Sequence, residues 1–185
     1  MTNRQINDFY PTPHSIIRVL LKKLTWPLQN TKIWEPCCGD GRFTQALITK
    51  GATVISHDIT KGQDFFKWSE AQALTLITNP PFKVIRPFID HAFSIGVQRM
   101  ALICPERLWA CGKGQEQWNR HRPSLWANLT WREDYLGKGG SPDRALAIAI
   151  WTVVNSSQCQ YQIWNKTEKS LERNLHVRQR PADSV

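Results

Sequence analysis

The chain has 185 residues, 41% of them hydrophobic and 21% charged, which suits one globular domain and leaves little room for a second. It contains no apolar run near the roughly 18 residues that a membrane span needs, and its N-terminus lacks the apolar core of a signal peptide. We therefore expect a cytoplasmic protein with no membrane partner. The five cysteines show no CxxC spacing and the histidines no ligand spacing, so no metal site is expected.

The formal net charge is +9, from 24 Lys and Arg against 15 Asp and Glu. Acidic and basic residues balance between positions 35 and 98, whereas the segments on both sides are basic. A neutral centre with basic flanks fits a small-molecule site in a protein that meets a polyanion. A basic surface kept for solubility is the alternative, so charge alone favours nucleic-acid binding only modestly.

Strand-like and helix-like patterns alternate along much of the chain. Strands are predicted at 31–38, 52–59, 74–79 and 97–105, and helices at 41–51 and 86–96. This alternation predicts right-handed crossovers and a parallel, doubly wound α/β sheet with helices on both faces. Further on, strands at 129–136 and 145–154, separated only by 137–144, are expected to add an antiparallel hairpin at the edge. We expect one domain over 1–165 and a polar, flexible tail over 166–185.

The turn after the first predicted strand reads EPCCGDG, from Glu35 to Gly41. Gly39 and Gly41 let the backbone turn tightly and approach a ligand, and the helix that follows presents free N–H groups. The dinucleotide fingerprint GxGxxG is not met, because Thr44 occupies its last position. The carboxylate of Glu35 disfavours a pyrophosphate and favours a positively charged ligand group, such as an amine or a sulfonium.

Two further acidic residues follow the second predicted strand. Asp58 stands about twenty residues after the turn, from where an acid reaches ribose hydroxyls in nucleoside-binding sheets. Asp64 could accept a hydrogen bond from an adenine amino group, and Phe65 could cover the ring. Each acid taken singly fits a loop cap or a surface carboxylate better. Their order at the strand ends together favours a nucleoside-bearing cofactor.

The third predicted strand ends in Asn79-Pro80-Pro81-Phe82. Prolines cannot donate to a strand ladder, so they end the strand, and Asn-Pro is also an ordinary turn starter. The stretch alone does not decide between a simple turn and a functional site.

Five segments in order, DFYPTP, EPCCGDGRF, HDI, GQDF and NPPF, resemble the class I S-adenosylmethionine-dependent amino-methyltransferases. They look most like the small N6-adenine DNA methyltransferases of phages and plasmids, in the gamma-like order with the cofactor motif before NPPF. The resemblance covers about residues 8–154. It implies a seven-stranded Rossmann-like methyltransferase fold, S-adenosylmethionine as cofactor, and methyl transfer to adenine N6 in DNA. Cys37 stands where the family commonly has a small apolar residue.

The resemblance also implies roles for single residues. Glu35 and the turn Gly39–Gly41 would hold the methionine part of the cofactor, Asp58 its ribose, and Asp64 with Phe65 its adenine. The complete implied cofactor set is Tyr10, Thr12, Pro13, Glu35, Pro36, Gly39, Asp40, Gly41, Asp58, Asp64 and Phe65, with Tyr10, Thr12 and Pro13 closing over the ligand. The implied catalytic set is Asn79, Pro80, Pro81 and Phe82.

The chemistry of amine methylation explains why Asn-Pro-Pro-Phe suits this task. An exocyclic amine is a poor nucleophile, because its lone pair is delocalised into the base. The side-chain oxygen of Asn79 and the carbonyl of Pro80 would accept its hydrogens and favour a pyramidal nitrogen. Phe82 would stack on a base extruded from a duplex, although a core position is its ordinary alternative.

A basic segment at about 105–145 is the expected face for the target. Its candidate nucleic-acid contacts are Lys113, Arg120, Arg122, Lys138, Gly139, Gly140 and Arg144. A flexible turn, and core packing of the neighbouring tryptophans, are the alternatives. Because no room remains for a recognition domain, we expect relaxed specificity or a partner protein that supplies it.

Three other functions remain open. An RNA base methyltransferase, acting on adenine N6 or guanine N2, shares the NPPF motif. A protein glutamine N5-methyltransferase usually has Tyr at the fourth motif position and carries a separate helical domain, so Phe82 counts against it. A non-catalytic nucleic-acid-binding module of the same fold would have been free to lose Asn79 and both prolines.

Overall fold

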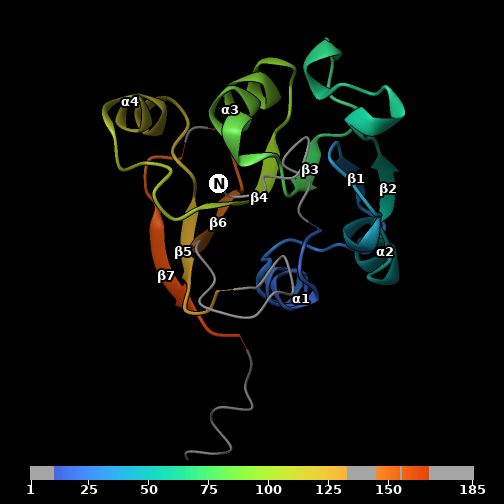
Figure 1. Ribbon diagram of the computed structural model, residues 1–185, viewed down its shortest axis with the longest axis horizontal. Helices are drawn as coiled ribbons and strands as arrows, with labels where there is room; N and C mark the ends of the chain where they lie inside the picture. The colour runs from blue at the N-terminus through green and yellow to red at the C-terminus, as the bar shows by residue number, and fades with distance from the viewer. Residues whose placement is uncertain (1–10, 133–144, 155, 167–185) are drawn as a thin grey trace, which may run out of the picture.

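The computed structural model describes residues 11–132, 145–154 and 156–166 (Figure 1). Its helices are α1 (His14–Lys23), α2 (Arg42–Thr49), α3 (Ile85–Ser94) and α4 (Gly112–Arg120), with three short 3-10 helices, η2 (Ile59–Lys61), η3 (Phe65–Lys67) and η4 (Phe82–Val84). Its strands are β1 (Lys32–Glu35), β2 (Thr53–Ser56), β3 (Thr75–Thr78), β4 (Arg99–Pro105), β5 (Leu125–Leu129), β6 (Leu146–Trp151) and β7 (Gln160–Trp164). None of these described helices has the length and apolar character to cross a membrane.

The seven strands form one sheet in the order β2-β1-β3-β4-β6-β5-β7. Strands β2, β1, β3 and β4 are parallel neighbours. Strand β6 pairs antiparallel with both β4 and β5, and β7 pairs parallel with β5. The predicted doubly wound, mostly parallel α/β sheet is therefore confirmed.

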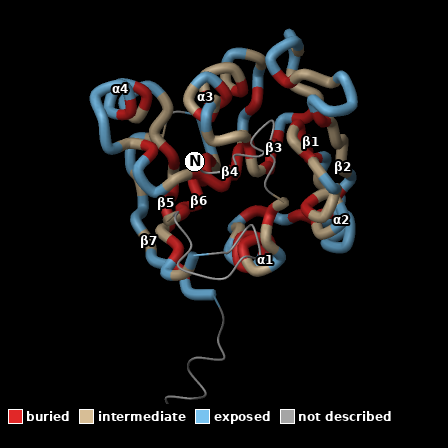
Figure 2. The backbone as a smooth tube through the Cα atoms, viewed as in Figure 1, coloured by how far each residue is buried: buried red, intermediate tan, exposed pale blue. Residues whose placement is uncertain are grey.

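Apolar side chains alternate between the two faces of the sheet, as the two-residue period of a strand requires. Ile77 joins the cluster under α1 and α2, while its neighbour Leu76 joins the cluster under α3. In the first cluster Leu20 and Phe43 anchor the helices, and in the second Phe88 does so. The central strands are accordingly buried along their length (Figure 2). Helices cover both faces and leave the strand ends for a site.

The predicted antiparallel hairpin is present as β5 and β6, but its first strand and its place in the sheet differ from the prediction. Strand β5 begins at Leu125, four residues before the predicted start at 129, and β6 lies between β4 and β5 rather than at the edge. Every residue of β6 is buried, as suits a strand that pairs with a neighbour on each side. The edge strand next to β5 is β7, which was not predicted, and its mostly exposed residues suit that position. Helices α1 and α4 were also not predicted, and residues 133–144 and 167–185 lie outside the described residues.

Candidate functional site

The order of the strands fixes where a ligand can bind. From β1 the chain adds β2 on one side and then returns to add β3 on the other, so the direction of winding reverses between β1 and β3. In doubly wound sheets, ligands bind beyond the carboxyl ends of the strands at this switch point. Strand β1 ends at Glu35, and β3 ends directly before Asn79. The two main predicted motifs therefore lie at neighbouring strand ends.

The turn between β1 and α2 has the backbone that its glycines predict. Gly39 and Gly41 have φ values of 51° and 81°, in the left-handed region that favours glycine. A Cβ at Gly41 would meet no atom within 4 Å, so the backbone conformation, rather than crowding, calls for glycine there. Asp40 lies exposed in this turn and forms an ion pair with Arg42 at 2.6 Å.

Glu35 is a buried carboxyl group, with 1% of its surface exposed. Burial raises its pKa to about 7, an effect that Asp40 and Asp58 reinforce and the hydrogen bond from Thr44 opposes. Within the described part of the chain, no Lys or Arg forms an ion pair with it. Thr44, which broke the dinucleotide fingerprint in the sequence, is thus the residue whose hydroxyl donates to this carboxyl. No pattern in the sequence predicts that contact.

Asp58 follows β2 and ties it to the glycine turn. Its Oδ2 accepts from the Gly39 amide at 2.8 Å, and its Oδ1 accepts from the Thr60 amide at 2.9 Å and the Thr60 hydroxyl at 2.6 Å. Burial acts to raise the pKa of Asp58, but these hydrogen bonds and nearby Lys61 outweigh it, so the pKa lies below its ordinary value. Asp58 is therefore an ionised group beside the turn, and its Oδ2, which accepts one hydrogen bond, keeps acceptor capacity for a ligand hydroxyl.

Asp64 and Phe65 lie farther along the same side of the sheet. Asp64 caps η3 by accepting from the Phe66 amide at 3.0 Å. Phe65 is 5% exposed and stacks on Phe88 with ring centroids 4.0 Å apart, so its ring belongs to the core under α3. Its neighbour Phe66 is 40% exposed. Phe66 is an aromatic candidate for an adenine contact that the sequence analysis missed.

Asn79 follows β3 and turns its amide toward the N-terminal segment. Its Nδ2 donates to the Thr12 hydroxyl oxygen at 3.1 Å, while its Oδ1 is buried without a hydrogen-bond partner among the described residues. Pro80 is buried, and Pro81 directly precedes η4, with its carbonyl accepting from the Val84 amide at 3.1 Å. Phe82 is half-buried and packs against the cluster under α1 and α2.

The N-terminal segment meets both motifs. Thr12 is 8% exposed, and its carbonyl accepts from Arg42 Nη1 at 3.4 Å. Pro13 precedes α1 and accepts from the amides of Ile16 and Ile17. Tyr10 lies outside the described residues. Thr12 thus contacts Asn79 after β3 and Arg42 after the glycine turn, an arrangement that the sequence alone did not predict.

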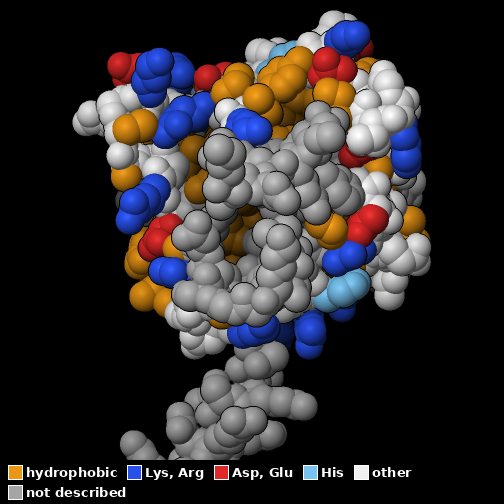
Figure 3. Space-filling model, viewed as in Figure 1, with side chains coloured by type: hydrophobic (Ala, Val, Ile, Leu, Met, Phe, Trp, Pro, Cys, Tyr) orange, Lys and Arg blue, Asp and Glu red, His pale blue; other side chains and the backbone are white. Residues whose placement is uncertain are grey.

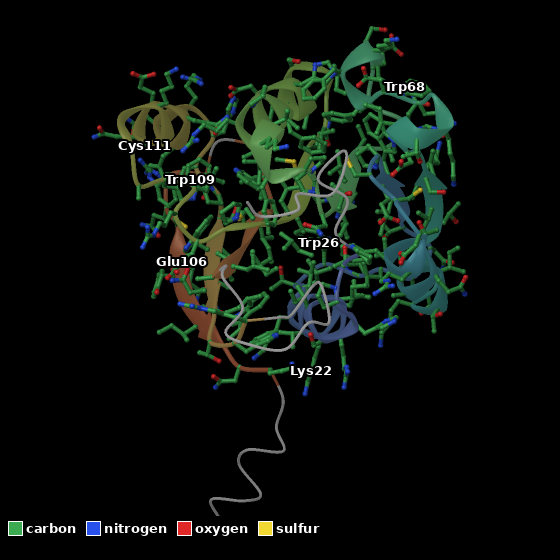
Figure 4. The ribbon with its side chains drawn as sticks, in the orientation of Figure 1. Lys22, Trp26, Trp68, Glu106, Trp109 and Cys111 are labelled. Carbon is green, nitrogen blue, oxygen red and sulfur yellow. The ribbon has the colours of Figure 1, made fainter. Side chains whose placement is uncertain are left out.

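An aromatic cluster next to Asp58 was also missed. Trp34 Nε1 donates to His57 Nδ1 at 3.0 Å, and His57 stacks on Trp68 with ring centroids 4.7 Å apart. Burial lowers the pKa of His57, in keeping with a neutral ring whose Nδ1 accepts a hydrogen bond. Trp68 lies toward the edge of the molecule that carries β1 and β2 (Figure 4). These rings form a wall beside the strand ends.

The candidate nucleic-acid contacts differ in how exposed they are, and some lie outside the described residues. Lys113 and Arg120 are exposed on α4, where Lys and Arg side chains gather (Figure 3), although Arg120 also pairs with Asp90 at 3.4 Å. Arg122 is half-buried, donates to the Ser157 carbonyl at 2.7 Å and lies 6.0 Å from the Trp118 ring, so part of its role is structural. Lys138, Gly139, Gly140 and Arg144 lie outside the described residues.

Tryptophans underlie this basic face. Trp109 lies edge-on to Trp118 and is tilted against Trp126, with ring centroids 5.5 and 5.8 Å apart, and Figure 4 places Trp109 and Glu106 below α4. Trp126 is 7% exposed, so it packs in the core as the alternative reading expected. Across residues 11–132, 145–154 and 156–166, no three His, Cys, Asp or Glu side chains group in a way that could hold a metal ion.

Solved structures of low sequence identity share this fold. No protein-family model and no curated protein matches the chain. The methyltransferase subunit of the type I restriction-modification system from Streptococcus thermophilus superposes with a TM-score of 0.59 at 11% identity, covering 94% of this chain and 54% of that one. A Listeria monocytogenes protein, described as a candidate class I S-adenosylmethionine-dependent methyltransferase, gives 0.59 at 12%, covering 96% and 71%. The 23S rRNA methyltransferase ErmE gives 0.53 at 12%, covering 80% and 70%.

These likenesses identify the fold class: the chain has the class I S-adenosylmethionine-dependent methyltransferase fold. It spans about half the length of the Streptococcus subunit.

Proposed function

We propose that the protein is an S-adenosylmethionine-dependent methyltransferase that transfers a methyl group to the exocyclic N6 amine of adenine in DNA. The observation that carries this proposal is a pair of buried groups at neighbouring strand ends. Glu35 after β1 is a buried carboxyl group that accepts from the Thr44 hydroxyl but has no described Lys or Arg partner, and Asn79 Oδ1 after β3 is a buried acceptor without a described partner. The first favours a ligand cation and the second an N–H donor.

The groups around Glu35 fit the cofactor. Glu35 would hold its amino group, and the left-handed turn at Gly39 and Gly41 would let the backbone lie against the methionine part. Asp58 is ionised and would accept from the ribose hydroxyls, while Asp64 and the exposed ring of Phe66 would contact the adenine. Bound S-adenosylmethionine supplies an electrophilic methyl group on a positively charged sulfur.

Asn79 and Pro80 would prepare the amine. The Asn79 oxygen and the Pro80 carbonyl each accept one amine hydrogen, which favours a pyramidal nitrogen with its lone pair directed at the methyl carbon. The nitrogen–carbon bond forms as the carbon–sulfur bond breaks, the electron pair stays on sulfur, and the methylated nitrogen then loses a proton to solvent. No strong general base is required. The two prolines restrict the backbone, which suits a site where about 1 Å of misplacement can cost a hundredfold in rate.

Nucleic acid is the acceptor that the charge of the chain favours. The net charge is +9, and exposed Lys113 and Arg120 lie on α4. We assign the target contacts to the segment at about 105–145 of a single domain over 1–165, with sequence specificity supplied by a partner protein. RNA is the second candidate, because the DNA-modifying subunit and the rRNA methyltransferase resemble this fold to a similar degree.

The test is methyl transfer from radiolabelled S-adenosylmethionine to duplex DNA, single-stranded DNA, RNA and protein, followed by identification of the methylated base. We expect N6-methyladenine in DNA, and an Asn79→Ala variant that keeps the cofactor affinity but loses at least about a hundredfold in rate. Asn165→Ala is the matched control, because it also removes a hydrogen-bonded side-chain amide, one that accepts from the Thr130 hydroxyl at 2.8 Å. Asn165 follows β7, which three strands separate from β3, so the control lies far from the site. Label in RNA alone would reassign the substrate, and an active Asn79→Ala variant would reject the mechanism.

A further inference from the structure

A side chain from the N-terminal segment holds the amide of Asn79. Thr12 stands 67 positions before Asn79, and its hydroxyl oxygen accepts from Asn79 Nδ2 at 3.1 Å. Both groups lie in the interior of the site, since Thr12 is 8% exposed and Asn79 is half-buried. Arg42 donates to the Thr12 carbonyl at 3.4 Å and pairs with Asp40 at 2.6 Å, so the position of Thr12 is itself fixed by the glycine turn.

The two ends of a carboxamide have opposite hydrogen-bonding character. The oxygen accepts, whereas the nitrogen carries two donors, and a donor turned toward an amine hydrogen would repel it. In the structure, the contact with Thr12 occupies the nitrogen end and leaves Oδ1 buried without a described partner. A β-branched side chain such as Thr also has few χ1 rotamers, so its hydroxyl offers a fixed point of attachment.

We propose that Thr12 is a positioning residue that orients the Asn79 carboxamide so that Oδ1, and not Nδ2, faces the acceptor amine. This inference rests on the proposed function and assigns Thr12 a role other than covering the cofactor. The two roles predict different defects. Loss of a cover weakens cofactor binding, whereas loss of orientation slows transfer and leaves cofactor binding unchanged.

The experiment compares Thr12→Val and Thr12→Ser with the wild-type chain. Valine has the shape of threonine but no hydroxyl, and serine keeps the hydroxyl. We expect Thr12→Val to lower the single-turnover rate at saturating cofactor and nucleic acid by about 10- to 100-fold, and Thr12→Ser to stay within about threefold of the wild-type rate. The dissociation constant for S-adenosylmethionine should change by less than about twofold in both. Thr75→Val is the matched control, because it makes the same change in a buried residue of β3 whose hydroxyl has no described partner, and its rate should equal that of the wild type.

A second measurement needs no turnover. The side-chain amide resonance of Asn79, assigned by its absence from Asn79→Ala, should shift in Thr12→Val and remain in place in Thr12→Ser and Thr75→Val. If Thr12→Val fails to fold in a thermal melt, Thr12→Ala takes its place in both measurements. A wild-type rate in the hydroxyl-free variant, or a slower rate explained entirely by weaker cofactor binding, overturns the inference while the proposed function stands. A wild type that methylates none of the acceptors rejects the proposed function and the inference together.

Discussion

Replacing Glu35 with Gln should make the free protein more stable and weaken its ligand binding. The carboxyl group is 1% exposed, and burial raises its pKa to about 7 from an ordinary value of 4.5. The Glu35 carboxyl group therefore binds a proton more tightly in the folded protein than in the unfolded chain. Protonated Glu35 stabilises the fold fully below pH 4.5, and this stabilisation is lost as the pH rises through 7. A glutamine keeps the shape and an oxygen for the Thr44 hydroxyl but never ionises.

The magnitude follows from the two pKa values. Each pKa unit corresponds to about 1.36 kcal/mol, so raising the pKa from 4.5 to about 7 corresponds to about 3 kcal/mol of lost stability at pH 8. Glu35→Gln should recover most of this loss at pH 8 and almost none at pH 4.5. For a chain of this size, about 3 kcal/mol corresponds to roughly 6–12 °C in the melting temperature.

The assay is denaturant and thermal unfolding of Glu35→Gln and wild type between pH 4.5 and 8. The difference between the two proteins isolates Glu35 from other groups that titrate in this range. Glu70→Gln is the matched control, because it makes the same substitution at an exposed position. A cationic ligand group requires ionised Glu35, so cofactor affinity of the wild type should rise with pH up to about 7 and that of Glu35→Gln should be low and flat. Equal pH dependence of unfolding in both proteins, or a variant less stable than wild type at pH 8, would refute the reasoning.

Three further changes test the packing and hydrogen bonding. Thr75→Val should raise the free energy of unfolding by about 1 kcal/mol in urea, because the buried hydroxyl has no described partner; a decrease would reveal a bond to that hydroxyl. Gly114→Ala should lower it by about 1–3 kcal/mol despite the better helix propensity of alanine, since a Cβ would lie 2.8 Å from the Leu108 carbonyl, and an unchanged melting temperature would contradict this. Asp58→Ala should cost about 2–3 kcal/mol at pH 7 by leaving the Gly39 amide without its acceptor. Because the pKa of Asp58 is lowered in the fold, its contribution to stability is present above pH 3.8 and fades as the pH falls further. If Asp58→Ala remained equally less stable than the wild type in acid, the role given to the ionised carboxylate would be wrong.

The parallel half of the sheet could be predicted because most of its strands end in a local signal. Pro36 follows β1, Asn79 follows β3 and Pro105 is the last residue of β4, and apolar runs precede those residues. The antiparallel half carries no such signal, since the pairing of β6 with β4 depends on contacts between distant segments. The alternating apolar residues Leu129 and Trp131 fit a strand that starts at 129, whereas the observed strand starts at Leu125. Strand order is a tertiary property, and a two-residue period does not encode it.

The candidate site was predictable to the extent that its chemistry lies in turns. Gly39, Gly41 and Asn79 were recognised because a strand end with these residue types calls for an explanation. The contacts of Thr44 with Glu35 and of Thr12 with Asn79 join different elements and leave no trace in spacing. For the pair Phe65 and Phe66, the sequence offers two aromatic residues, and only the path of η3 decides that the first enters the core and the second faces outward.

The buried carboxyl group of Glu35 and the buried Asn79 Oδ1 differ in kind, and this difference restricts what can bind between β1 and β3. A phosphate-bearing ligand would place negative charge near Glu35 and Asp58 and would raise the cost of ionising Glu35 further. A neutral ligand would gain no charge pairing with Glu35. A ligand that presents a cation at β1 and an N–H group at β3 satisfies both the carboxylate and the Asn79 oxygen, and each contact recovers a cost that the free protein carries. A sulfonium cofactor and an amine acceptor would together meet these requirements at adjacent strand ends, which is the physical basis of the proposed methyl transfer.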